Sequence, residues 1–242
     1  MNKDIKYLIE KTANFNVIDY QEDEEGSIDN NDINNIIYKY YPKDNKELFD
    51  VICKKIEENK YGDSNMCWPD FSDIDISQIK SLCGVFMDAL KLYYTKFSRF
   101  EIELIGWDTS NVISLEKLFE GCKKLKYVGL YGLDLSNVKD MSNMFKDCYS
   151  LECVNFENVK MEYVTNMDSM FNGCKNLKKL DLSNFSTRHV LSMKSMFEKC
   201  ELLTELDLSS FETQDVRSMG FMFHECKNLK KLDLSNFDTH NL

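Results

Sequence analysis

Residues 180–200 read LDLSNFSTRHVLSMKSMFEKC, and residues 206–226 repeat this pattern as LDLSSFETQDVRSMGFMFHEC. The cysteine that closes each stretch belongs to a series of five with a constant 26-residue period, and a phenylalanine precedes each cysteine by three positions. The series consists of Phe119 and Cys122, Phe145 and Cys148, Phe171 and Cys174, Phe197 and Cys200, and Phe223 and Cys226. A constant period of about 20–50 residues is typical of one structural unit copied along a chain. We therefore expect a solenoid of 26-residue units.

Each unit combines two hydrophobic periods. Leu180 and Leu182 alternate with polar residues, and this period of two is typical of a strand with one buried face. Val190, Met193 and Met196 are spaced by three, which favours one face of a helix. The sequence therefore predicts an α/β fold. Each unit contributes a strand, a turn and a helix, and the strands form a parallel sheet on one face.

Polar turns join these elements, as in WDTSNV at 107–112 and FDTHNL at 237–242. Side chains of Asp, Thr, Ser and Asn accept hydrogen bonds from the free N–H groups at the start of a helix. We therefore interpret these residues as structural caps.

The two stretches quoted first resemble BspA-like leucine-rich repeats, which are characterised by LDLSxFDTSNVxxMxxMFxxC. The segment DIDISQIKSLCGVF at 73–86 resembles a first, irregular copy, in which Phe86 precedes Phe119 by more than the regular period. The resemblance covers roughly residues 40–242 and implies a leucine-rich-repeat-type solenoid. Members of that family are typically secreted or attached to the cell surface. Many leucine-rich repeats carry a buried asparagine ladder. The resemblance implies that aromatic stacking replaces it here, at Phe185, Phe211 and Phe237.

The chain divides into three parts. Residues 1–41 form a helical and acidic segment, residues 42–60 a capping helix, and residues 61–242 the repeats, with an irregular first repeat at 68–100. The helix is predicted over 44–58, because its start carries a capping-box spacing and its apolar residues share one face. Its expected role is to cover the open end of the first repeat. The last repeat is incomplete in this sequence, which predicts an uncapped C-terminal end.

The acidic run QEDEEGSIDNND at 21–32 places oxygen-bearing side chains around Gly26, in the manner of an EF-hand loop. Its first position is Gln21 rather than Asp, and its twelfth is Asp32 rather than the longer Glu. A solvated acidic loop is therefore the favoured interpretation, and calcium binding is the alternative.

Composition excludes some partners. The net charge is −11 and no basic stripe is visible, which argues against nucleic acid, because phosphate binding needs clustered Lys and Arg. No apolar run is long enough to span a membrane. The start MNKDIKYLIEKTANF lacks a signal-peptide core, which predicts a cytoplasmic protein, whereas the resemblance implies the cell surface. Nine cysteines, an odd number, fit a reducing compartment.

No pattern of catalytic, metal-binding or cofactor-binding residues is present. His189, His224 and His240 have no partner at metal-ligand spacing and no recognisable nucleophile. The periodic cysteine series is not a zinc motif, and we favour buried free thiols over disulfides between neighbouring units. We therefore expect a protein that is not an enzyme and needs no cofactor.

A solenoid of this kind binds partners on the exposed face of its sheet, where residues between the buried leucines point outward. Tyrosines there are the expected anchors, because rigid aromatic residues often dominate the binding energy of an interface. The sequence thus predicts a protein–protein interaction module, with self-association through the C-terminal end as the alternative. The candidate face comprises Tyr127, Tyr131, Asn155, Glu157, Lys179, Asp181, Glu205, Asp207, Lys231 and Asp233.

Overall fold

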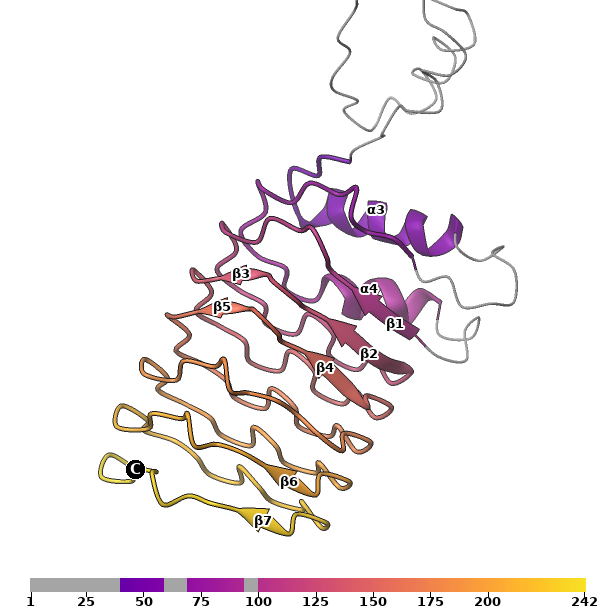
Figure 1. Ribbon diagram of the computed structural model, residues 1–242. Helices are drawn as coiled ribbons and strands as arrows, with labels where there is room; N and C mark the ends of the chain where they lie inside the picture. The colour runs from indigo at the N-terminus through magenta and orange to yellow at the C-terminus, as the bar shows by residue number, and fades with distance from the viewer. Residues whose placement is uncertain (1–39, 59–68, 94–99) are drawn as a thin grey trace, which may run out of the picture.

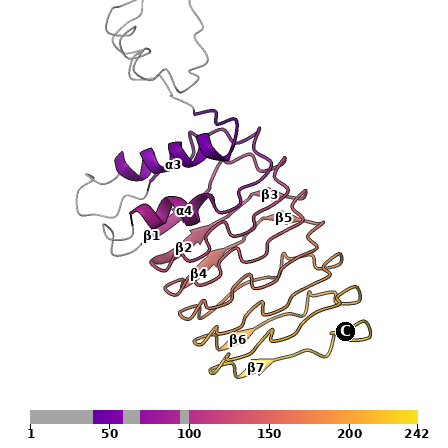
Figure 2. The same cartoon turned by 180° about the vertical axis from the view of Figure 1, so that it is seen from behind.

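The computed structural model describes residues 40–58, 69–93 and 100–242. Within them, successive repeats lie beside one another along one direction, and each contributes one circuit of the chain (Figure 1; Figure 2). The acidic run at 21–32, with its EF-hand-like spacing, lies outside the described residues.

Within these ranges, two helices lie toward the N-terminal end, α3 (Asn45–Glu58) and α4 (Val85–Leu92). The helix predicted over 44–58 is present as α3. The Asp44 carboxylate accepts the Glu47 N–H, and the Glu47 carboxylate accepts the Lys43 N–H, both at 2.9 Å. One apolar face is buried against the repeats and α4, which places α3 over the end of the stack (Figure 1). That face consists of Leu48, Val51, Ile52 and Ile56.

Seven short strands of the described chain pair in parallel. They are β1 (Phe100–Glu103), β2 (Leu125–Gly129), β3 (Asp134–Leu135), β4 (Cys153–Asn155), β5 (Lys160–Met161), β6 (Glu205–Leu206) and β7 (Lys231–Leu232). From β2 onward, paired residues stand exactly one repeat apart, as in Tyr127 with Cys153 and Glu205 with Lys231. The single sheet that the sequence predicts is instead three small sheets, in the orders β1-β2-β4, β3-β5 and β6-β7. Strands stay short because a turn closed by an aspartate or asparagine side chain follows the strand segment in most repeats.

The helix predicted in each repeat is wrong for the repeats from residue 100 onward, where the structure assigns turns. Residues in the left-handed region interrupt this side at two positions per repeat, for example Asn143 at φ 56° and Asp147 at φ 58°. Alternate N–H groups then bond outward to the next repeat, as from Phe145 to the Met170 carbonyl at 2.9 Å. The intervening N–H groups close tight turns, as from Cys148 to the Phe145 carbonyl. Bonds to the neighbouring repeat therefore replace the bonds of a helix.

A column of phenylalanine rings runs through the core. Phe86, Phe119, Phe145, Phe171, Phe197 and Phe223 stack in sequence with ring centres 5.1–5.8 Å apart. The contact between Phe86 and Phe119 confirms that the irregular first copy continues the phenylalanine column despite its longer spacing. The stacking expected at the second phenylalanine position is partial, because Phe211 stacks on Phe237 whereas Phe185 meets Phe156 edge-on. The rings that precede the cysteines are thus the continuous aromatic core.

The cysteine series forms a ladder of hydrogen bonds beside the phenylalanine column. From Cys148 onward, each thiol donates a hydrogen bond to a phenylalanine carbonyl of the preceding repeat. Cys148 donates to Phe119 at 3.0 Å, and Cys174 donates to Phe145 at 3.1 Å. All eight cysteines in the described ranges are free, in agreement with the favoured interpretation. Burial raises the pKa of Cys148 well above its usual range, so the thiol stays neutral.

This burial predicts a graded reactivity of the thiols. Under native conditions iodoacetamide should modify the exposed Cys83 and Cys153 and should leave the fully buried Cys148, Cys174 and Cys200 unmodified. In denaturant the protected thiols should react as well. Peptide mass spectrometry distinguishes the sites, and native labelling of Cys174 at the rate of Cys153 would contradict the ladder.

Candidate binding surface

The predicted face is a set of aligned columns on the strand side of the repeats. Parallel register places Glu101, Tyr127 and Cys153 in one column, and Glu103, Gly129 and Asn155 in the next. Buried residues alternate with these positions, for example Val128 and Val154, so the column side chains lie on the opposite face. The structure therefore brings together Tyr127 and Asn155 of the predicted set in adjoining columns.

An aromatic patch lies at the N-terminal half of this face. Tyr131 is 47% exposed and Ile105, one repeat earlier in the same position, is 50% exposed. A Cβ at Gly129 would stand 3.2 Å from the Tyr127 hydroxyl, so the ring of Tyr127 lies across the glycine. The missing side chain at Gly129 thus gives Tyr127 its place on the surface. We call Ile105, Tyr127 and Tyr131 the aromatic patch.

Carboxylates surround the aromatic patch. The Cγ of Glu103 lies 3.2 Å from the same Cβ position at Gly129, and Glu103 and Glu157 are exposed. Burial raises the pKa of Tyr127, and Asn155 is its side-chain hydrogen-bond partner. The phenol is therefore neutral at physiological pH, and the negative charge of this region comes from its carboxylates.

The aspartate row is held by its own backbone turns. Asp181, Asp207 and Asp233 each accept the N–H of the serine two residues later, at 2.9 Å. Hydrogen bonds from that serine lower the pKa of each aspartate, so all three are charged at neutral pH. The row therefore ties down neighbouring backbone, and the carboxylates stay exposed.

The remaining predicted residues are exposed at the C-terminal half. Lys179, Glu205 and Lys231 occupy equivalent positions in three successive repeats, and Glu205 pairs with Lys231 in the β6–β7 register. Charges of both signs alternate there, whereas the N-terminal half is aromatic and acidic. The face is thus divided into two chemically different halves.

The face predicted from the sequence lacks the first members of the columns, Glu101, Glu103 and Ile105. The two glutamates lie on β1, which pairs with β2 and extends the face by one strand, and Ile105 follows β1. The sequence does carry a strand signal here, because the apolar residues Phe100, Ile102 and Leu104 alternate with two glutamates. The structure buries all three. The irregular spacing before them concealed that this segment belongs to the repeats.

The polar turns combine two roles. Asp108 accepts the Ser110 N–H at 3.1 Å, but this contact closes a turn, because no helix begins here as the sequence predicts. The buried Thr109 and Thr187 instead donate to carbonyls of the next repeat, at 2.7 and 2.9 Å. These threonines therefore join repeats rather than start helices.

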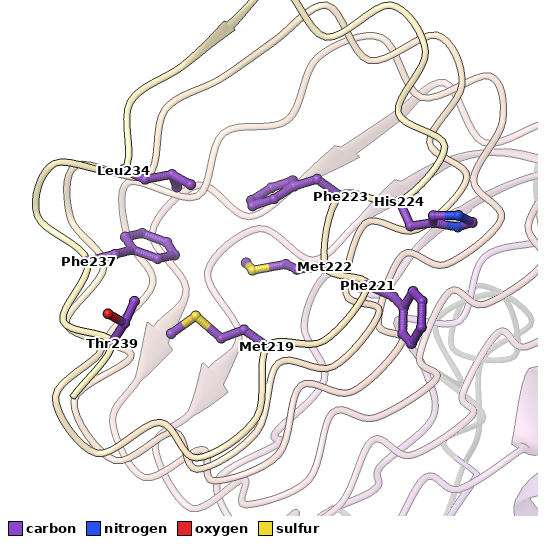
Figure 3. Close-up of a pocket in the computed structure, with 8 residues that line it drawn as sticks. All are labelled: Met219, Phe221, Met222, Phe223, His224, Leu234, Phe237 and Thr239. Atoms are coloured by element: carbon purple, nitrogen blue, oxygen red, sulfur yellow. The ribbon is translucent and has the colours of Figure 1, made fainter. Parts of the chain in front are cut away.

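A cavity of about 430 Å³ lies at the last described repeat (Figure 3). Its lining is mostly apolar and consists of Met219, Phe221, Met222, Phe223, His224, Leu234, Phe237 and Thr239. Met193, Met196 and Phe197, which occupy the positions of Met219, Met222 and Phe223 one repeat earlier, are fully buried by their neighbours. The cavity therefore continues the core columns, and self-association at this end stays a prediction.

Within the described ranges, no cluster of three or more His, Cys, Asp or Glu side chains could hold a metal ion. Neither of the described helices is long and apolar enough to cross a membrane.

Comparison with known proteins gives one family. The description "Mycoplasma protein of unknown function, DUF285" matches three overlapping stretches, residues 58–153, 88–202 and 150–242. No curated protein matches the chain. The three matches fall on the repeats, and together they span the aromatic core and the whole candidate face.

Proposed function

We propose, from the premise that this chain belongs to the DUF285 family of Mycoplasma proteins, that its repeats form a BspA-like leucine-rich-repeat solenoid that binds a protein partner. The observation that carries this proposal is the aromatic patch, held on a rigid array of repeats. Ile105 and Tyr131 are large apolar side chains about half exposed on adjacent repeats, and the Tyr127 ring lies across Gly129 on β2.

Rigidity supports a binding role. The repeats are joined on one side by backbone bonds at 2.7–3.2 Å and through the core by stacked rings. A partner would therefore meet side chains that are already ordered, which reduces the entropic cost of binding. Aromatic side chains in such positions often supply most of the binding energy.

The acidic surroundings favour a partner with basic residues near its apolar contact. Glu103 and Glu157 flank the aromatic patch, and the charged aspartate row continues the negative character toward the C-terminal half. Complementary charge increases the rate of association and excludes acidic competitors.

The test is quantitative capture by immobilised protein with crosslinking, followed by affinity measurement on each captured partner. Tyr131→Ala should weaken binding by about thirtyfold, because a hot-spot aromatic residue contributes about 2 kcal/mol. The matched control is Tyr163→Ala, because Tyr163 is also 47% exposed but follows β5 at the other side of the repeat.

Asp207→Lys should also weaken binding. Asp207→Asn removes the charge but keeps an oxygen acceptor for the Ser209 N–H, so comparing the two variants separates the effect of charge from that of turn stability. Circular dichroism confirms that each variant is folded. Equal affinity of wild type, Tyr131→Ala and Asp207→Lys for every captured partner would refute this face as the binding site.

A further inference from the structure

A second charged surface lies along the edge where the chain passes from each cysteine into the next strand. The loops leading into β2, β4, β6 and β7 follow one another along this edge (Figure 1). The first, second and fourth positions after each of the five periodic cysteines together hold seven lysines and two glutamates, a positive surplus in a chain of net charge −11. We call this set the lysine edge: Lys123, Lys124, Lys126, Glu152, Lys175, Lys178, Glu201, Lys227 and Lys230.

The sequence shows no basic stripe because these lysines fall in alternate repeats and are far apart along the chain. Stacking brings equivalent positions together. Strands lie about 4.8 Å apart, so lysines two repeats apart, such as Lys178 and Lys230, are separated by about 10 Å along the stack. The fold therefore brings together a row of lysines that does not appear as a basic stripe in the sequence.

The intervening repeats hold several of the lysines in place. Glu201 contacts Lys175 at 3.0 Å and Lys227 at 3.2 Å, so one carboxylate bridges two repeats. Glu152 pairs with Lys126 at 3.0 Å. These glutamates orient the lysines of the repeats on either side, and they also place negative charge between the lysine rows.

Tyr149 has a similar bridging position. The ammonium groups of Lys123 and Lys175 lie 5.4 and 5.7 Å from the centre of its ring. Cation–π contacts on a ring of this kind are worth about 0.5–1 kcal/mol at exposed sites. The ring is thus engaged by two lysines and is not free to stack on a base.

Two lysines are available for a ligand. Lys178 and Lys230 are exposed and form no ion pair with any residue that the structure describes. They occupy the same position in the third and fifth cysteine repeats, with Thr204 between them. An anionic ligand following the edge would therefore meet positive charge at intervals of about 10 Å.

We infer that the lysine edge binds an extended acidic segment of a protein, with acidic residues at about every third position. A peptide in the extended polyproline II conformation has three residues per turn and advances about 3.1 Å per residue, so every third side chain returns to the same face after about 9 Å. A uniform polyanion fits less well, because its charges would also meet Glu152 and Glu201. Single-stranded nucleic acid additionally needs free aromatic rings, and Tyr149 is already engaged.

The test uses a fluorescein-labelled peptide of six Glu-Ser-Ser repeats and the full chain, with binding followed by fluorescence anisotropy. Saturable binding is expected at low ionic strength, weakened about tenfold at about 0.5 M salt because exposed charges are screened. Lys178→Glu combined with Lys230→Glu should weaken binding about tenfold. The matched control is Lys139→Glu combined with Lys194→Glu, exposed lysines of other columns that change net charge equally, and it should stay within twofold.

Three comparison ligands make the outcome decisive: the same peptide composition with clustered glutamates, an oligothymidine of equal charge, and vesicles containing phosphatidylserine. Weaker binding of all three supports the inference. It is overturned if the spaced peptide does not bind, if the control variant loses as much affinity, or if any comparison ligand binds more tightly. Tighter oligothymidine or vesicle binding would assign the edge to nucleic acid or to a lipid surface instead.

Discussion

Phe171→Ala is expected to lower the free energy of unfolding by about 3–5 kcal/mol, the range for removing a buried aromatic ring. The ring is fully buried, and it stacks on Phe145 at 5.4 Å and on Phe197 at 5.8 Å. Its loss leaves a cavity in the middle of the aromatic column, and neighbouring rings cannot close it without breaking the bonds that join repeats. A change of this size is a large part of the total stability of a typical domain.

Urea denaturation followed by circular dichroism measures this effect. The control is Phe221→Ala, because Phe221 is 63% exposed and should change stability by less than about 0.5 kcal/mol. Equal midpoints for the two variants would show that the stacked rings do not form the core.

Gly173→Ala is expected to lower stability by about 2–4 kcal/mol, for two separable reasons. Gly173 has φ +78°, where an L-residue is strained by about 1–2 kcal/mol. A Cβ there would also stand 2.7 Å from the Asp147 carboxylate oxygen and 3.4 Å from Asp147 backbone atoms. Because the nearest atom is the end of a side chain that can turn away, this contact adds about 1–2 kcal/mol, the lower part of the range for overpacking.

Gly121 offers a matched comparison, because it occupies the same position two repeats earlier. Its φ is +69°, and a Cβ there would meet nothing within 4 Å. Gly121→Ala should therefore cost only the backbone strain, about 1–2 kcal/mol. Adding Asp147→Ala to Gly173→Ala should recover part of the loss, since it removes the nearest atom. Equal losses at both glycines, with no recovery in the double variant, would rule out the steric part.

Much of the fold can be predicted from residue types and their spacing in the sequence. The repeat period, the buried leucines of the strands and the phenylalanines beside the cysteines are found where their spacing places them, except in the last repeat, where Leu234 is exposed and Phe223 is partly buried. The helix α3 follows from its apolar face and its capping residues. Each of these features depends on local periodicity and on burial, which adjacent residues determine.

The helix predicted within each repeat shows where local periodicity is insufficient. Val190, Met193 and Met196 point inward as a helical pattern requires, and all three are fully buried. Yet the Met193 N–H bonds to the Ser218 carbonyl of the next repeat at 2.9 Å. Burial of every third residue is compatible with a helix and with a chain of tight turns, and the neighbouring repeat decides between them.

Part of the candidate face could likewise be predicted from local periodicity. Tyr127, Tyr131 and the aspartates follow from alternation along a strand, and in the structure Tyr131 and the aspartates are exposed. The approach of Glu103 to Gly129 and the inclusion of Ile105 depend on how strands are aligned. Both depend on residues of one repeat lying beside residues of the next.

The sequence by itself thus determined which residues are buried and how often the unit recurs, because both follow from short-range spacing of apolar side chains. The tertiary structure alone decided what the backbone N–H groups of the turns bond to and which charges become neighbours. Hydrogen bonds between repeats form only when segments a whole repeat apart in the sequence come side by side. The lysine edge arises likewise, because stacking turns a sequence separation of two repeats into a distance of about 10 Å.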